Sequence, residues 1–199
     1  RRSRGLGDVY KRQHLDTTHP FLGKELEKIG FQNYYDFKSL KSELKLSGYF
    51  GIVIRSRIPI DKDFIEKCEN LKFIARIGSG TENIDTNYAQ KKGIKIISTP
   101  EGNANAVGEH VLGMLLSLLN KINSSSSEVK NGIWNRESNR GIELKDKTVG
   151  LIGYGNTGKS FAKKLIGFGV NTIFYDIKNI KKDKYASPVS LSYLKNNSD

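Results

Sequence analysis

Residues 147–158 read Lys-Thr-Val-Gly-Leu-Ile-Gly-Tyr-Gly-Asn-Thr-Gly, and this stretch decides the fold. The first half is the apolar run of a buried strand, and the second half has the spacing Gly-x-Gly-x-x-Gly. A helical pattern follows, and then a strand at 172–175 that ends at Asp176, 18 residues after the third glycine. A strand, a glycine turn, a helix, a second strand and an acid in this order indicate a dinucleotide-binding βαβ unit.

Each residue of this fingerprint has a physical role in binding a dinucleotide. Gly153 permits the tight turn, Gly155 lets a pyrophosphate approach the backbone, and Gly158 lets helix and strand pack closely. The helix N-terminus offers unpaired N–H groups and the positive end of its dipole to the phosphates. Asp176 can accept hydrogen bonds from both ribose hydroxyls and would repel a 2′-phosphate, so the sequence predicts NAD rather than NADP. The alternative is a doubly wound sheet whose glycine turn binds no nucleotide.

Upstream of this unit, short β-rich runs alternate with helical stretches, which is typical of a parallel sheet covered by helices. A long helix is expected at 109–122; it is apolar nearly all round, so we expect it to be buried on several sides. Cys68 and Trp134 are expected to be buried packing residues. The other expected elements are strands at 49–54, 73–77 and 94–97, and helices that begin at Pro20, include Leu40, Leu44 and Leu46, span 85–92 and span 191–197.

The composition excludes several classes of protein. The chain has 199 residues, of which 37% are hydrophobic and 27% charged, as in an ordinary globular protein. The longest nearly apolar run, 111–119, is far shorter than the roughly 20 residues that a bilayer span needs. The single cysteine excludes a disulfide framework and a multi-cysteine metal site, and it is compatible with a reducing cytoplasm.

The net charge of +12 is not one basic patch. Residues 1–13 hold five Lys/Arg and one Asp, and Ser3 to Gln13 resemble the translation of a sequencing adapter. We therefore expect residues 1–13 to be a non-native tail; the alternative is a natural, disordered basic tail. The remaining basic residues are spread over helix faces as in a solvated surface, which disfavours a nucleic-acid partner.

Two further clusters follow expected strands. Gly78-Ser79-Gly80 forms a turn whose N–H groups can hold an anion such as a carboxylate, or it is an ordinary loop at a strand end. Arg55-Ser56-Arg57 follows the strand at 49–54, and ligands of open α/β sheets bind beyond the carboxyl ends of strands. Two arginines there can grip a phosphate or carboxylate, or they are plain surface charge.

Three stretches together, 75–85, 103–110 and 147–158, resemble the D-isomer-specific 2-hydroxyacid dehydrogenases. The resemblance runs from His14 to Asp199 and implies a flavodoxin-like substrate domain at 14–103, followed by a truncated Rossmann NAD-binding domain at 104–199. Within the family, residues 54–57 and 100–103 look most like members that oxidise a small phosphorylated 2-hydroxy acid. Glu82 and Gly108 depart from the family pattern, which usually has Asp and Ala there.

The resemblance assigns binding roles residue by residue. It implies that the arginine cluster contacts a substrate phosphate, that the Gly78 turn binds the substrate carboxylate, and that the helix at 109–122 forms a homodimer contact. The implied substrate-binding residues are Arg55, Ser56, Arg57, Gly78, Ser79 and Gly80. The implied NAD-binding residues are Asn103, Val107, Gly153, Gly155, Asn156, Thr157, Gly158 and Asp176.

The resemblance implies that the catalytic residues lie elsewhere. The family uses an Arg, a Glu and a His for catalysis, and all three are expected beyond residue 199, so the chain is expected to be an inactive N-terminal fragment. His19 and His110 are expected at helix starts in structural roles. No metal and no membrane partner are expected. The alternatives are another substrate within the family, an NAD-sensing protein of the corepressor type, or a basic nucleic-acid-binding module.

Overall fold

The computed structural model describes residues 10–36, 38 and 47–199. The expected helix through Leu40, Leu44 and Leu46, and most of the expected tail, lie outside these residues. The chain divides into two compact units, Arg1–Pro100 and Glu101–Asp199. This division falls three residues before the domain boundary expected after Asn103.

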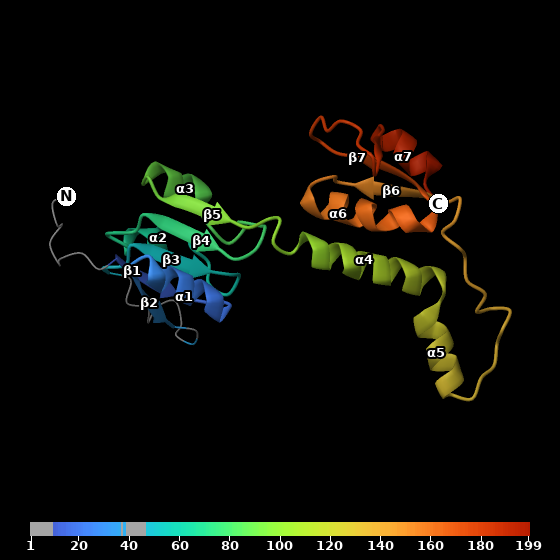
Figure 1. Cartoon of the computed structure of the whole chain (residues 1–199), viewed down its shortest axis with the longest axis horizontal. Helices are drawn as coiled ribbons and strands as arrows, with labels where there is room; N and C mark the ends of the chain where they lie inside the picture. The colour runs from blue at the N-terminus through green and yellow to red at the C-terminus, as the bar shows by residue number, and fades with distance from the viewer. Residues whose placement is uncertain (1–9, 37, 39–46) are drawn as a thin grey trace. The chain divides into compact units, whose positions relative to one another are not determined.

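The first unit is built on a five-stranded sheet in which every neighbouring pair is parallel. The strand order is β2-β1-β3-β4-β5, which is the flavodoxin-like order and reverses between β1 and β3. Figure 1 shows the strands in this unit: β1 (Tyr10–His14), β2 (Phe31–Tyr35), β3 (Gly51–Ile54), β4 (Phe73–Arg76) and β5 (Lys95–Ser98).

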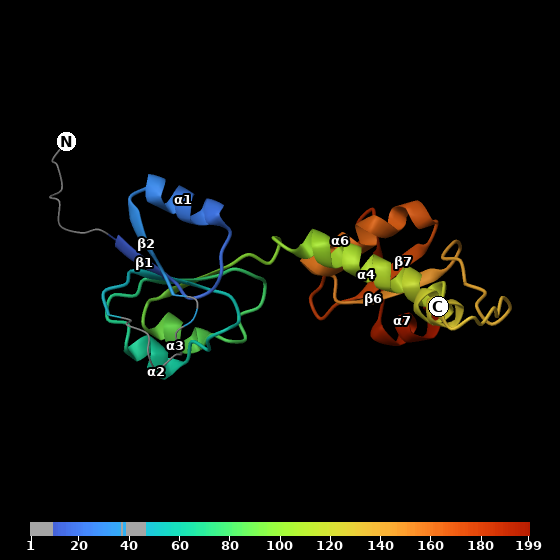
Figure 2. The same ribbon diagram turned by 90° about the horizontal axis from the view of Figure 1, so that it is seen from below.

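Among the residues that the structure describes, three capped helices cover this sheet: α1 (Pro20–Lys28), α2 (Lys62–Glu66) and α3 (Thr86–Lys91). Figure 2 shows α1 on one side of the sheet and α2 and α3 on the other. The side chains of His19, Asp61 and Asp85 each accept a hydrogen bond from a backbone N–H in the first turn of these helices. The core consists of buried residues such as Ile52, Ile54, Ile60, Phe64 and Ile74.

Strand β1 corrects the expected start of the folded region at His14. It begins at Tyr10 and pairs with β2 and β3, so residues 10–13 belong to the sheet. These residues have no apolar alternation, so the sequence predicted only the stump of a first strand, at 14–16. Their burial is unusual: Arg12 is 8% and Gln13 4% exposed, and Arg12 Nε and Gln13 Oε1 have no hydrogen-bond partner among the described residues. Burial lowers the pKa of Arg12 to about 10.

The second unit has a three-stranded parallel sheet in the order β6-β7-β8. Helix α4 packs along α6, and apolar residues of both helices join a core around Leu165 and Phe174. The elements are α4 (Ala104–Leu119), α5 (Ile122–Lys130), β6 (Thr148–Ile152), α6 (Asn156–Leu165), η2 (Ile166–Phe168), β7 (Asn171–Tyr175), β8 (Ser187–Pro188) and α7 (Leu191–Asn197).

Helix α4 differs from the expected helix in its bounds and its burial. It begins five residues earlier than expected, so His110 lies well inside the helix rather than at its start. Met114 is 61% and Leu118 75% exposed, because only one face of α4 packs on α6 within this chain. Within the described residues α4 is therefore buried on one side, and burial of its other faces in a subunit interface stays a prediction.

The two residues that were expected to be buried, Cys68 and Trp134, differ in their exposure. Cys68 is buried, its Sγ donates a hydrogen bond to the carbonyl oxygen of Phe64, and burial raises its pKa to about 12. Trp134 is 82% exposed, so its expected burial is wrong. Within the described residues, no helix is long and apolar enough to cross a membrane, and no group of three His, Cys, Asp or Glu side chains is placed to hold a metal ion.

Candidate functional site

The glycine turn of the fingerprint lies between β6 and α6. Gly153 has φ +91°, a conformation that favours glycine. Nothing lies within 4 Å of where a Cβ of Gly155 would be, so this backbone is open to a ligand. A Cβ on Gly158 would overlap the carbonyl oxygen of Gly153, so the close approach of helix and turn requires glycine there. Each of the three glycines thus meets the steric condition that dinucleotide binding imposes.

A cavity of about 420 Å³ lies at this turn. Its lining includes the fingerprint residues Gly153, Gly155, Asn156, Thr157 and Gly158. Asn156 and Thr157 are the first two residues of α6, where backbone N–H groups lack helical acceptors. The cavity therefore offers both space and hydrogen-bond donors to a phosphate.

Asp176 follows β7 and is held by two backbone groups. Its Oδ2 accepts a hydrogen bond from Tyr154 N at 2.7 Å, and its Oδ1 accepts one from Lys178 N at 2.8 Å. These two hydrogen bonds lower the pKa of Asp176, and the bond from Tyr154 N has the larger effect. Each carboxylate oxygen keeps a lone pair free, and the residue borders a cavity of about 390 Å³. The carboxylate is thus charged, fixed in direction and able to accept two further hydrogen bonds.

Asn103 and Val107 lie at the beginning of α4. Asn103 is its N-cap residue, without a side-chain capping hydrogen bond, and Val107 is in the first turn. Neither lines the cavity at the glycine turn, although Val111 of the same helix does. Gly108 has a packing role: a Cβ there would lie 3.2 Å from the backbone nitrogen of Phe161, so glycine lets α4 approach α6.

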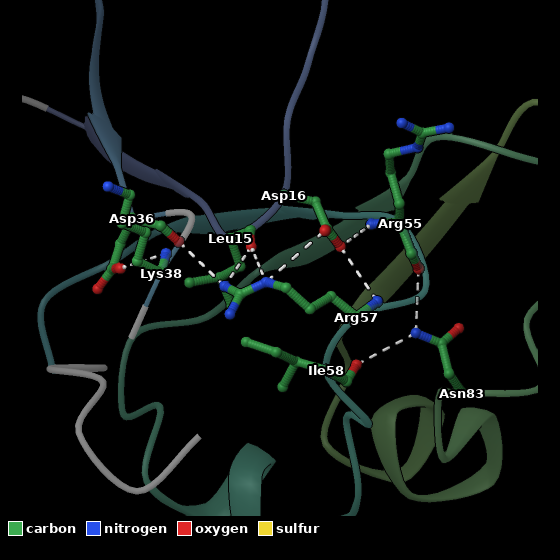
Figure 3. Close-up of polar contacts among 8 residues, drawn as sticks. All are labelled: Leu15, Asp16, Asp36, Lys38, Arg55, Arg57, Ile58 and Asn83. Carbon is green, nitrogen blue, oxygen red and sulfur yellow. Dashed lines mark hydrogen bonds and ion pairs between the residues drawn. The ribbon is translucent and has the colours of Figure 1, made fainter. Parts of the chain in front are cut away.

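The arginine cluster follows β3, at the point where the strand order of the first sheet reverses. Asp16, which follows β1, accepts hydrogen bonds from Arg55 N at 2.7 Å and from Arg57 N at 3.4 Å. On the other side of the loop, Asn83 Nδ2 donates to the carbonyl oxygens of Arg55 (3.0 Å) and Ile58 (3.2 Å). Figure 3 shows the loop held between these two side chains.

The two arginines of this loop point in different directions (Figure 3). The guanidinium of Arg57 donates to the carbonyl oxygen of Leu15 at 2.6 Å and to that of Asp36 at 3.2 Å, and its Nε lies 3.7 Å from Asp16 Oδ1. The guanidinium of Arg55 extends away from these groups. Ser56 between them is exposed. In this structure the two guanidinium groups therefore do not form a joint clamp.

The second glycine turn follows β4. Gly78 has φ +145°, and its N–H donates to Thr99 Oγ1 at 3.2 Å. A Cβ on Gly78 would overlap the guanidinium of Arg76, and a Cβ on Gly80 would overlap the carboxylate of Glu82. Arg76 is thus a charged group at this turn that the sequence analysis left out of the site. Its position at the end of β4, directly before the glycines, is the signal that could have identified it.

None of the three histidines belongs to the two glycine turns or to the arginine cluster. His14 is fully buried in β1, where its Nε2 is 3.0 Å from Asn33 Oδ1, and burial lowers its pKa. His19 caps α1 by accepting from Phe21 N at 3.2 Å. His110 is exposed on α4. The expected helix-start position is confirmed for His19 alone.

Comparisons with known proteins show the family of this chain. The family model for the catalytic domain of the D-isomer specific 2-hydroxyacid dehydrogenases matches residues 12–188. A hydroxypyruvate reductase from Thermotoga maritima is 39% identical over 148 residues, which are 74% of this chain and 48% of that protein. A D-3-phosphoglycerate dehydrogenase from Archaeoglobus fulgidus is 39% identical over 128 residues, which are 64% of this chain and 24% of that protein.

Among solved structures, a D-lactate dehydrogenase from Aquifex aeolicus, complexed with NAD and lactic acid, superposes with a TM-score of 0.80. It is 25% identical, and the match covers 95% of this chain and 58% of that one. The chain thus spans about half, or less, of the length of the curated relatives named above. The chain belongs to the D-isomer-specific 2-hydroxyacid dehydrogenase family, and the expected α/β fold with parallel, Rossmann-like sheets is confirmed.

Proposed function

We propose that this chain belongs to an NAD-dependent dehydrogenase that oxidises 3-phosphoglycerate to 3-phosphohydroxypyruvate. It would supply the turn that binds NAD and the site that binds the phosphate and carboxylate groups of the substrate. This reaction would place the protein in serine biosynthesis, in the cytoplasm. The observation that carries the proposal is the glycine turn at 153–158 with Asp176 held beside it. The bound nicotinamide would accept the hydride from C2 of the substrate. The proposal assigns none of these 199 residues to the family's catalytic Arg, Glu or His.

The cofactor part rests on charge and hydrogen-bonding capacity. The pyrophosphate would lie on the open backbone of Gly155 and receive N–H groups from the first turn of α6. The ribose hydroxyls would donate to the free lone pairs of Asp176, whose charge repels a 2′-phosphate. This argument favours NAD over NADP.

The substrate part rests on the charges at the carboxyl ends of β3 and β4. Arg55 presents its guanidinium away from the loop that holds it (Figure 3), which suits a phosphate ligand. The turn with Gly78, Ser79 and Gly80 would receive the carboxylate, with Arg76 adding positive charge there. Arg57 would hold the loop rather than the substrate, because its donors already bind backbone carbonyls.

The proposal includes a homodimer. Met114, Leu118 and Ile122 are 61%, 75% and 51% exposed on α4 and α5. Apolar side chains in such numbers on one helical segment are typical of an interface. Light scattering after gel filtration is expected to give twice the mass of one chain. The Leu118→Lys variant is expected to have the mass of a single chain.

The direct test is ligand binding to the 199-residue chain, measured by NADH fluorescence and by calorimetry. We expect NADH to bind more tightly than NADPH, and Asp176→Ser to bring the two dissociation constants together. We expect 3-phosphoglycerate to bind more tightly than D-glycerate or D-lactate. Arg55→Ala should weaken that preference with little change in Tm, whereas Arg57→Ala should lower Tm. A chain that folds cooperatively and binds no NADH would overturn the cofactor part.

The same measurements separate the alternatives. Equal affinity for 3-phosphoglycerate and D-lactate would indicate another substrate within the family. NADH binding without any acid binding would favour an NAD-sensing role. Nucleic-acid binding that weakens steeply with salt and persists after removal of residues 1–13 would favour a nucleic-acid module.

A further inference from the structure

Tyr154, the residue between the first two fingerprint glycines, is buried although its position in the motif is variable. It is 3% exposed, and its ring stacks on Phe174 of β7 with centroids 3.9 Å apart and planes 9° apart. A stacked pair at this distance fixes the ring in one orientation. Tyr154 thus anchors the glycine turn to the strand that ends at Asp176.

The hydroxyl of Tyr154 reaches a second segment, 29 residues further along the chain. It donates to Asp183 Oδ1 at 2.9 Å. The same oxygen accepts the N–H groups of Tyr185 (2.8 Å) and Ala186 (3.2 Å), and Asp183 Oδ2 lies 3.1 Å from Lys159 Nζ on α6. Asp183 therefore joins the loop after β7, the glycine turn and α6 at one carboxylate.

This loop borders the place where the adenosine half of a dinucleotide would lie. Ile177, Lys178, Asn179 and Ile180 line the cavity of about 390 Å³ together with Asp176. Tyr154 thus makes two hydrogen bonds near this cavity. Its backbone N–H donates to the carboxylate of Asp176, and its hydroxyl donates to Asp183 at the far end of the loop.

We propose that Tyr154 and Asp183 form a positioning pair for the adenosine half of the cofactor. Their hydrogen bond fixes the loop at 177–186 against the glycine turn, so that the loop and Asp176 keep the arrangement that accepts the ribose and the base. This inference rests on the proposed binding of NAD and deepens it.

The test compares variants of the 199-residue chain for NADH and ADP-ribose binding. Tyr154→Phe keeps the ring, its stacking and the N–H to Asp176, and removes the hydroxyl alone. We expect both dissociation constants to rise about tenfold, because a hydrogen bond to a charged acceptor is lost. Asp183→Ala should give a loss at least as large, because it also removes the contacts with Tyr185 N, Ala186 N and Lys159. Asp183→Asn keeps an acceptor oxygen and should restore most of the affinity.

Tyr193→Phe is the matched control, because Tyr193 is 53% exposed on α7; its dissociation constants should equal those of the wild type. The double variant Tyr154→Phe/Asp183→Ala should be no worse than Asp183→Ala, since Asp183→Ala already removes the bond that Tyr154→Phe removes. Circular dichroism confirms that each variant is folded at the assay temperature.

The outcomes separate two failures. A folded wild-type chain that binds neither NADH nor ADP-ribose overturns the proposed function and the positioning pair with it. Wild-type binding that Tyr154→Phe leaves unchanged overturns the positioning pair alone. Additive losses in the double variant, or an Asp183→Asn variant as weak as Asp183→Ala, also overturn the pair, since they show that the two residues act separately or through charge.

Discussion

Replacing Asp16 by alanine is expected to destabilise the first unit and release the arginine loop. The carboxylate is 12% exposed, accepts two backbone N–H groups of the loop and pairs with Arg57. Truncation leaves the N–H of Arg55 without the Asp16 acceptor and removes the Asp16 charge from beside the Arg57 guanidinium. A hydrogen bond to a charged group contributes roughly 1.5–3 kcal/mol, so we expect the free energy of unfolding to fall by about 2–3 kcal/mol.

The conservative change separates hydrogen bonding from charge. Asp16→Asn keeps an oxygen that accepts from Arg55 N and loses the negative charge beside Arg57, so we expect a loss of about 1 kcal/mol. For a unit of this size, 1 kcal/mol corresponds to roughly 4–8 °C in Tm. Asp16→Ala should therefore lower the Tm of the first unit by about 10–20 °C.

The assay must report on the first unit itself. The single tryptophan, Trp134, lies in the second unit, so its fluorescence is unsuitable. Amide hydrogen exchange read by mass spectrometry on peptides around residues 50–60 follows the loop directly, and circular dichroism gives Tm. Exposed Glu69→Gln is the control for loss of a carboxylate. Unchanged exchange at Arg55 and Arg57 in Asp16→Ala, with a wild-type Tm, would refute the reasoning.

Three further predictions concern other parts of the chain. Gly158→Ala would push a Cβ into the carbonyl oxygen of Gly153, so it should lower the free energy of unfolding by about 1–3 kcal/mol and weaken NADH binding. Urea unfolding measures the stability, and fluorescence titration measures the binding. A variant with unchanged stability and binding would contradict the close approach of helix and turn. Arg12→Leu removes a buried guanidinium whose Nε has no hydrogen-bond partner among the described residues, so it should stabilise the first unit by about 1 kcal/mol. A lower Tm of the variant would show that the contact of the guanidinium with aromatic rings contributes more than the burial of its charge costs. Burial alone would raise the pKa of Asp183, but its hydrogen bonds lower it to about 2, below the ordinary value of 3.8. Its stabilisation is therefore complete above about pH 5 and is lost progressively as the pH falls toward about 1, so the stability gap between wild type and Asp183→Asn should close over that range.

The sequence predicted the elements whose causes are local. The glycine turn was recognised because its conformations exclude side chains, as the φ of +91° at Gly153 shows. The strands at 51–54, 73–76, 95–98 and 148–152 are apolar runs, and α7 coincides with the expected helix. The family assignment followed from these same motifs. Such features depend on residues within a few positions of one another, so a single sequence carries them.

The missed features have causes that are distant along the chain. Strand β2 and the polar strand β1 exist through pairing with neighbours, since neither has an apolar alternation of its own. Trp134 is exposed although its side chain is apolar, because none of the helices and strands that the structure describes covers it. Propensity does not encode which partner a strand or side chain meets.

The sequence by itself determined the class of fold, the glycine turn at 153–158 and the position of Asp176 after the next strand, because steric limits on glycine and the spacing of apolar residues act locally. Tertiary structure alone decided that Arg57 binds the carbonyl oxygen of Leu15 while Arg55 points away. It also decided that Tyr154 meets Asp183, 29 residues away. Both facts depend on which strand ends lie side by side in the sheet. The free energy of the whole packed unit, rather than any short stretch of sequence, sets that arrangement.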